Sequence, residues 1–200
     1  QYFNIASQRN SGIDVSANIS HDMGNAGLLT LRAEGTWQIK DDFRLLPTSD
    51  LESDNGEAGS PEWVADFRAT WAHPSGFSLF YGINVIGSTS NVEDFLEDNG
   101  GDRCIDSFNT DNPAGDLPIY GRYCPDLATP TTFYHNISIS QEIGDGMFDI
   151  TAGISNLFDT RPPRVSVLNG GQISLLGPVV SASQYPFVGR RAFINVSTRF

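Results

Sequence analysis

The sequence has no long apolar run. No stretch approaches the ~20 consecutive apolar residues that a membrane-spanning helix requires. Apolar residues make up 39% of the chain, and the mean hydropathy is -0.23. Hydropathy alone would therefore indicate a soluble protein, but it does not exclude membrane-spanning strands, whose alternating faces average to mild polarity. No signal peptide is visible, and the chain begins at Gln1 with what resembles a strand.

Basic residues are scarce: 12 Lys and Arg stand against 24 Asp and Glu. Nucleic acid is therefore not an expected partner, because phosphate binding requires a basic patch. The charge is unevenly placed. Segment 41–61 holds six acids and one Arg, and segment 89–130 holds nine acids and two Arg, so their charges of -5 and -7 account for the whole net charge of -12. The sequence predicts two acidic loops.

Motifs for catalysis and metal binding are also lacking. No phosphate-binding loop, zinc pattern or nucleophile elbow is present. The three histidines, His21, His73 and His135, share parity with the apolar residues of their segments, which prevents convergence on a cavity. The nearest approach to a Ca²⁺ cluster, at Asp98, Asp102 and Asp106, lacks EF-hand spacing. We expect no enzyme activity, no catalytic or metal-binding residues and no cofactor.

Cysteine occurs twice, at Cys104 and Cys124, in a polar segment that resembles a loop. Such a pair suits a disulfide in an oxidising compartment, whereas two free thiols are the alternative. We predict the disulfide.

Period-2 alternation of apolar and polar residues dominates the rest of the chain. In segment 28–40 it puts Leu29, Leu31 and Trp37 on one face and Arg32 and Glu34 on the other. Most predicted strands run to about twelve residues or more, and a tilted strand needs ~9–11 residues to cross a bilayer. No capped helix pattern is found. Seven strands are predicted, at 2–21, 27–41, 62–73, 77–89, 131–143, 147–158 and 187–200.

The connections alternate between short turns and the long loops 41–61, 90–130 and 159–186. Outer-membrane barrels have short periplasmic turns and longer extracellular loops. The alternation therefore predicts an antiparallel up-and-down transmembrane β-barrel with extracellular long loops and a periplasmic C-terminus. Within the last loop, Val165–Leu168 and Gln172–Leu176 read as a hairpin. Aromatic residues occur near both ends of the predicted strands, as is typical of membrane interfaces. Trp71, Phe77, Phe148 and Phe200 lie beside the short turns or at the terminus, and Trp63, Phe133, Phe158 and Phe187 lie near the long loops.

Seven is an odd number, whereas single-chain bacterial barrels normally have an even number of strands. We therefore expect further strands upstream of Gln1. One alternative is a complete small barrel, a passive pore or structural protein, whose eighth strand comes from splitting 2–21 at Gln8–Ser11. Another is a soluble β-sandwich, but sandwich strands are shorter and their loops do not alternate strictly.

Charged residues with the parity of the polar face are expected to point into the barrel lumen. Buried charges need water or a partner, and in a wide barrel that partner is a folded plug or a passing substrate. The predicted lumen-facing charges are Asp14, Arg32, Glu34, Asp66, Arg68, Glu142, Asp149 and Arg199.

Three motifs resemble one known family. GISNLFDTRPPRV (Gly153–Val165) is similar to the element that closes the penultimate strand of TonB-dependent receptors. YPFVGRRAFINVSTRF (Tyr185–Phe200) resembles their final strand, and NSGIDVSANISHD (Asn10–Asp22) resembles a strand further upstream.

The resemblance implies the C-terminal seven strands of a barrel of about 22 strands whose lumen holds an N-terminal plug. It implies energised import of a scarce ligand of the siderophore, cobalamin or oligosaccharide class, with the TonB energy-coupling complex acting through the plug. It also implies that Phe200 serves recognition by the barrel-assembly machinery. The plug is not in this sequence, and outer-membrane lipid and lipopolysaccharide are the expected surroundings.

Overall fold

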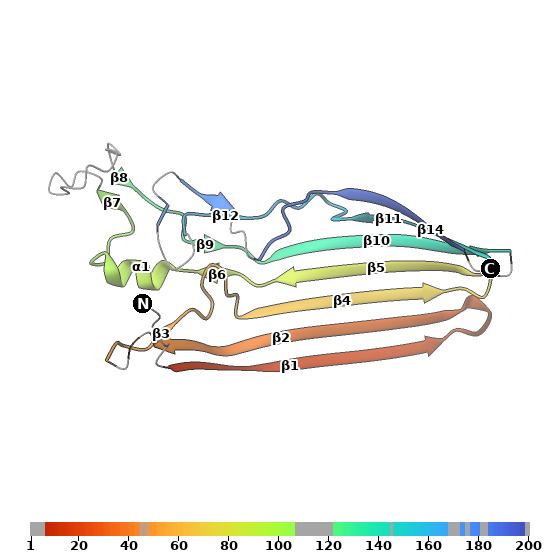
Figure 1. Ribbon diagram of the computed structural model, residues 1–200, viewed down its shortest axis with the longest axis horizontal. Helices are drawn as coiled ribbons and strands as arrows, with labels where there is room; N and C mark the ends of the chain where they lie inside the picture. The colour runs from red at the N-terminus through yellow and green to blue at the C-terminus, as the bar shows by residue number, and fades with distance from the viewer. Residues whose placement is uncertain are drawn as a thin grey trace.

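The computed structural model describes residues 7–44, 46, 48–106, 122–144, 146–167, 173–174, 177–180 and 184–198. Seven long strands form one antiparallel sheet in the order β1-β2-β4-β5-β10-β11-β14, as Figure 1 shows. Each strand therefore pairs with its long-strand neighbours along the chain, which confirms the predicted up-and-down antiparallel order. Their bounds are Ser7–Asp22, Leu28–Arg44, Trp63–Ala72, Phe77–Ile86, Thr132–Ile143, Phe148–Ser155 and Arg191–Thr198.

The pairing register places the alternating apolar residues on a single side of the sheet, here named the apolar face. Residues directly opposite in antiparallel strands point to the same side. One row crosses six strands, through Leu31, Ala69, Tyr81, Ile137, Ile154 and Ala192. The other side, named the polar face, carries Arg32 opposite Arg68 and Glu34 opposite Asp66. The alternation read from the sequence is thus coherent across the sheet.

The apolar face does not close over a dry centre. Trp37 is 60% exposed, Phe67 48% and Ile139 47%. Buried hydrophobic residues among the described positions lie in the long loops or, like Val85 and Tyr134, near the loop ends of strands. A soluble sandwich would instead bury one face of each sheet against a second layer. The structure therefore does not support the sandwich alternative.

Short turns join the strands at one end of the sheet, on the right in Figure 1. The first contains the 3-10 helix η1, Gly24–Ala26, and there Trp71 Nε1 donates to the Ala26 carbonyl at 2.7 Å. Gly27 follows with φ 96°, and a Cβ at this position would lie 2.1 Å from the Ala72 oxygen. Only glycine fits this close approach between the turn and β4.

Three long loops lie at the other end of the sheet (Figure 1): 45–62, 87–131 and 156–190. They hold short two-residue strands, β3 (Glu52–Ser53), β6 (Thr89–Ser90), β7 (Ile105–Asp106), β8 (Arg122–Tyr123), β9 (Ala128–Thr129), β12 (Arg164–Val165) and β13 (Val179–Val180). The expectation of no helix is wrong here, because α1 spans Val92–Asp98. Its seven residues make two turns, too few to display an amphipathic period in sequence. Nowhere in the described ranges is a helix long and apolar enough to span a membrane.

Several strand ends differ from the predicted ones. β5 ends at Ile86 and β14 begins at Arg191. In the last loop, Val167 pairs with Ile173, and β12 pairs with β13 beyond them, so this antiparallel ladder extends past the predicted hairpin. Its tip at 168–172, with 175–176, lies outside the described residues, as do Arg199 and Phe200.

The first strand is not split. β1 is continuous from Ser7 to Asp22, with a register shift between Ser11 and Gly12. The eighth strand that a complete small barrel requires is therefore not found there. In the described chain β1 pairs only with β2 and β14 only with β11, so the sheet remains open.

Candidate functional site

The described residues of the three long loops (45–62, 87–131 and 156–190) pack into one layer, here named the loop layer. Its centre is a hydrophobic cluster of Phe95, Leu127, Val165 and Val167, with Ala58, Val92, Ile105 and Ile173 packed around it. Every long loop contributes to the cluster. Burial of apolar surface from all three loops makes them one unit instead of three independent excursions.

Asn91 joins the first loop to the second. Its buried side chain donates from Nδ2 to Glu57 Oε2 at 2.5 Å and accepts at Oδ1 from the Ala58 amide at 2.9 Å. The neighbouring Ser90 amide donates to the Gly56 carbonyl at 2.8 Å. The asparagine immediately precedes α1, so the position of the helix is set by contacts with a different loop.

Ser166 joins the second loop to the third, and it is fully buried. Its Oγ lies 2.8 Å from Tyr123 Oη and accepts from the Asp126 amide at 2.9 Å. Its amide donates to the Asp126 carbonyl at 2.6 Å. Burying a hydroxyl that keeps several hydrogen-bond partners costs little free energy. Loss of those partners would destabilise the folded state.

Three further hydrogen bonds complete the loop layer. Tyr185, in the third loop, places its hydroxyl 3.1 Å from the Thr129 hydroxyl, which in turn lies 2.8 Å from that of Thr89. The Gly59 amide of the first loop donates to Gln184 Oε1 at 3.2 Å. All three pairs of loops are therefore cross-linked by hydrogen bonds.

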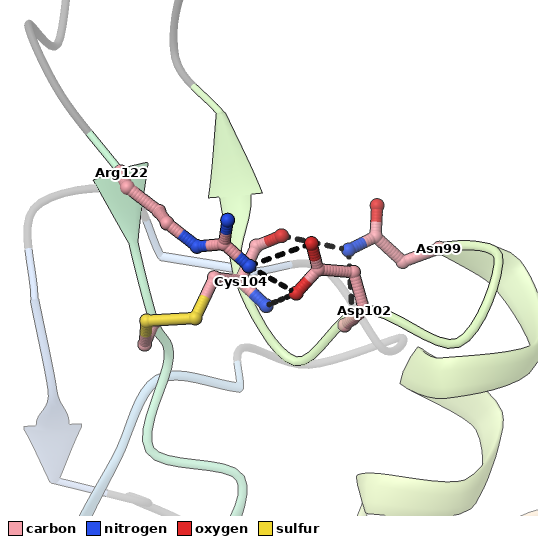
Figure 2. A network of polar contacts seen from close by, with 5 residues as sticks. Asn99, Asp102, Cys104 and Arg122 are labelled. Carbon is pink, nitrogen blue, oxygen red and sulfur yellow. Dashed lines mark hydrogen bonds and ion pairs between the residues drawn. A yellow bond between two sulfur atoms is a disulfide. The ribbon is translucent and has the colours of Figure 1, made fainter.

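The predicted disulfide between Cys104 and Cys124 is present and confirmed. Figure 2 shows it beside an ion pair, in which Arg122 Nη2 lies 2.7 Å from each oxygen of Asp102. Asp102 Oδ1 also accepts from the Cys104 amide at 3.0 Å, and Asn99 Nδ2 donates to the Cys104 carbonyl at 3.0 Å. The two cysteines are 20 positions apart in sequence. A disulfide that closes a loop of this size restricts the unfolded chain and so stabilises the folded protein by about 3 kcal/mol.

Acidic side chains gather where the first loop meets α1. Burial and the nearby Asp94 raise the pKa of Glu57 to about 8, although the hydrogen bond from the Asn91 side chain lowers it. Burial and the charges of Asp41, Glu52 and Asp94 raise the pKa of Asp54. At neutral pH Glu57 therefore holds a proton, which lets its carboxyl lie against that of Asp94.

These carboxylates do not form a metal site in the part of the chain that the structure describes. It contains no group of three or more His, Cys, Asp or Glu side chains arranged to hold an ion. Asp98, Asp102 and Asp106 are not brought together as such a group, and Asp102 pairs with Arg122 instead. The acidic loops remain a charged surface without a described ligand cluster.

The polar face brings four of the sequence-predicted charges together, in a group here named the charge square (Arg32, Glu34, Asp66 and Arg68). Arg32 stands opposite Arg68, and Glu34 stands opposite Asp66. Like charges directly opposite are unfavourable, but ion pairs along each strand offset them: Arg32 lies 3.8 Å from Glu34, and Arg68 pairs with Asp66. The group has no net charge.

Amides extend this polar network across the sheet. Asn84 Nδ2 donates to Asp66, and Asn136 Nδ2 donates to Asn84 Oδ1 at 3.1 Å. Asn136 Oδ1 accepts from the Asn156 amide at 3.1 Å. The contacts thus run from β4 to the end of β11, and the sequence reading missed them because asparagines in strands show no distinctive spacing.

The other predicted charges of the polar face lie apart. Asp14 accepts from Thr36 Oγ1 at 2.7 Å, and Glu142 stands opposite Asp149 near the short turns. That these charges face a lumen stays a prediction.

The three histidines do not converge. His73 Nδ1 lies 2.8 Å from Ser75 Oγ in a short turn, His21 stands opposite Leu29, and His135 Nδ1 lies 2.7 Å from Tyr81 Oη on the apolar face. The imidazoles serve three separate local contacts.

The NLFD motif (Asn156–Asp159) forms a tight turn, and its contacts were not apparent from the sequence. Asn156 adopts φ 53°, accepts at Oδ1 from the Thr160 amide at 2.8 Å and donates to the Thr160 carbonyl at 2.9 Å. Asp159 Oδ1 accepts from the Arg190 amide at 2.9 Å. A Cβ at Gly189 would lie 2.7 Å from this carboxylate oxygen. The two C-terminal motifs quoted above are therefore in direct contact.

No protein-family model matches the sequence, and a search of curated proteins finds no match. Among solved structures, the fold is similar to a crystal structure of a mutant ferric enterobactin receptor from Pseudomonas aeruginosa, with a TM-score of 0.50 and 15% sequence identity. The match covers 92% of this chain and 22% of the receptor chain. The chain has the fold of a segment of that receptor. It spans about a fifth of that receptor's length.

Proposed function

We propose that this chain is the C-terminal seven-stranded wall of a TonB-dependent outer-membrane receptor that imports a scarce ligand by energised transport. The observation that carries the proposal is the sheet itself. It has one coherent apolar face that is exposed at Trp37, Phe67 and Ile139, and all of its long loops lie at one end. Its likeness over 92% of the chain to a receptor for ferric enterobactin supports the same reading.

In this function the apolar face contacts the lipid of the outer membrane, and the polar face lines a lumen. The loop layer is extracellular and contributes to ligand capture, since it is rigidly cross-linked and concave sites form between such loops. The charge square around Arg32 and Asp66 contacts a plug domain encoded elsewhere in the gene product. The turn end of the sheet is periplasmic, and Phe200 serves recognition by the barrel-assembly machinery.

Ligand capture would be selective in charge. Acidic side chains dominate the first two loops, with a formal charge of -12 between them. Such a surface repels strongly anionic solutes, so a neutral or cationic ligand, or an anionic one neutralised by its metal, suits it best. Siderophore, cobalamin and oligosaccharide classes all remain candidates under this criterion.

The experiment uses the full-length gene product in cells. Uptake of labelled ferric siderophores, cobalamin and oligosaccharides is measured with and without an uncoupler of the proton gradient. One class should accumulate, and the uncoupler should abolish its accumulation while leaving surface binding intact. Accumulation that is insensitive to the uncoupler would indicate a passive pore, and a gene product that fractionates without membranes would contradict the barrel.

A further inference from the structure

The apolar face carries a groove at its loop end. The groove has a volume of about 350 Å³, and its lining includes Phe133, His135, Phe158, Thr160, Arg161 and Pro163. Phe133 and His135 belong to the apolar face, because they stand opposite Val85 and Ile83 of β5. The other four residues come from the third long loop. The groove therefore lies where the sheet meets the loop layer.

The ring surfaces in the groove are open to the surroundings. Phe133 is 47% exposed and Phe158 64%. Phe158 packs edge-on against the imidazole of His135, with ring centroids 4.9 Å apart and an interplanar angle of 76°. Exposed aromatic rings are unfavourable in water, but they suit the interfacial zone of a bilayer.

The groove is also held in shape before anything binds. His135 Nδ1 lies 2.7 Å from Tyr81 Oη, and the His135 carbonyl accepts from the Leu157 amide at 2.7 Å. The two hydrogen bonds between Asn156 and Thr160 fix the turn that presents Phe158. Walls that are already ordered lose little conformational entropy when a ligand binds.

Charge in the groove comes from Arg161, which lies beyond the rings on the loop side. Its side chain is exposed, and none of the salt bridges among the described residues includes it. A guanidinium matches a phosphate through paired N–H donors, and the neighbouring Thr160 hydroxyl offers another donor. The groove thus combines an apolar end that continues down the sheet with a cationic end.

We propose that this groove binds a phosphate-bearing membrane lipid, with the phosphate on Arg161 and the upper acyl chain against Phe133 and Phe158. The proposal rests on the membrane placement in the proposed function. A soluble anion would use only the arginine, whereas the open rings and the continuous apolar face beneath them fit an amphiphile. Bound lipid would anchor the third loop, and with it the loop layer, to the membrane surface.

The test uses the purified full-length protein in non-ionic detergent, titrated with phosphatidylglycerol or with diacylglycerol, which has the same acyl chains but no phosphate, and read by native mass spectrometry. The protein should prefer phosphatidylglycerol. Arg161→Gln should weaken phosphatidylglycerol binding about tenfold, the loss of roughly one charge-assisted hydrogen bond, and should leave diacylglycerol binding unchanged. Phe158→Ala should weaken binding of both lipids.

Arg164→Gln is the matched control, because Arg164 is an exposed arginine of the same loop outside the groove. An equal loss in this control, or no loss in Arg161→Gln, would overturn the proposal in favour of general electrostatic attraction. Full competition by inorganic phosphate would overturn it in favour of a soluble-anion site. A protein that stays dispersed without detergent contradicts the membrane placement itself, so that failure is distinguishable from failure of the groove.

Discussion

At the scale of the residue, Asn156 is constrained in both its backbone and its side chain. It is a non-glycine residue with positive φ, a conformation that costs other residues ~1–2 kcal/mol and that asparagine tolerates better. It also closes the turn through the two hydrogen bonds to Thr160. Both features explain why asparagine occupies the first position of the NLFD motif.

Replacement of Asn156 with alanine should therefore lower stability by about 2 kcal/mol, since it loses the hydrogen bonds and retains an unfavourable φ. Asn156→Gly loses the same hydrogen bonds, but glycine adopts a positive φ without strain. Its loss of stability should therefore be smaller than that of Asn156→Ala. Thermal unfolding of the full-length protein in detergent measures both. Equal losses in the two variants would show that φ plays no part.

Glu57 is the second informative residue, because its pKa depends on the loop layer. Folding raises this pKa from 4.5 to about 8, so the folded state favours the protonated carboxyl. Its contribution to loop packing is thus fully present below about pH 4.5 and is lost as the pH rises through about 8.

Hydrogen exchange of the amides at 56–60 should accordingly accelerate between pH 6 and pH 9 beyond the intrinsic pH effect. Glu57→Gln retains polar contacts without a titrating group and should abolish this excess. Glu62→Gln removes an exposed carboxylate from the same loop and should leave it unchanged. An excess that survives in Glu57→Gln would assign the titration to another group.

At the scale of the element, one row of the polar face depends on glycine. Ser138 stands opposite both Phe80 and Gly153, and Gly153 stands opposite Phe193. A Cβ at Gly153 would lie 2.6 Å from Phe193 Cζ and 2.7 Å from Ser138 Cβ. The Phe193 ring therefore occupies the space of the missing side chain, which is the way aromatic residues commonly cover glycine in sheets.

Gly153→Ala should destabilise the pairing of β11 with β14 by about 1–3 kcal/mol, the usual cost of overpacking. A second change, Phe193→Leu, shortens the reach of the opposing side chain and should recover part of the loss. The two single variants and the double variant form a cycle read by thermal unfolding. Simple additivity in this cycle would refute the contact.

At the scale of the whole molecule, the decisive quantity is the difference between the two faces of the sheet. Ala69 and Thr70 are neighbours on β4 that point to opposite faces. The apolar face meets lipid in the proposed function, and a lysine at the bilayer midplane costs about 2–4 kcal/mol.

Ala69→Lys should therefore reduce the amount of folded protein in the outer membrane, whereas Thr70→Lys should be tolerated. Membrane fractionation with heat-modifiable gel mobility measures the folded fraction of each variant. Equal folded fractions of the two variants would contradict the assignment of the apolar face to lipid, and with it the proposed transport function.

Much of this architecture is visible in local sequence because a strand that is wet on one side and apolar on the other must alternate with period 2. Segment 28–40 shows this directly, and the alternation of short and long connections predicted the order of the sheet. The disulfide was also predictable, since only two cysteines exist. By contrast, α1 was missed because two turns carry too little periodicity.

The amino-acid sequence by itself determined the strands, their two faces and the acidic character of the first two loops, since these follow from the pattern of neighbouring residues. Only the tertiary structure decided how Asn91, Ser166 and Tyr185 unite three loops, and how Asp159 meets Arg190. Such contacts join residues about 30 or more positions apart through single hydrogen bonds, and no local period encodes them.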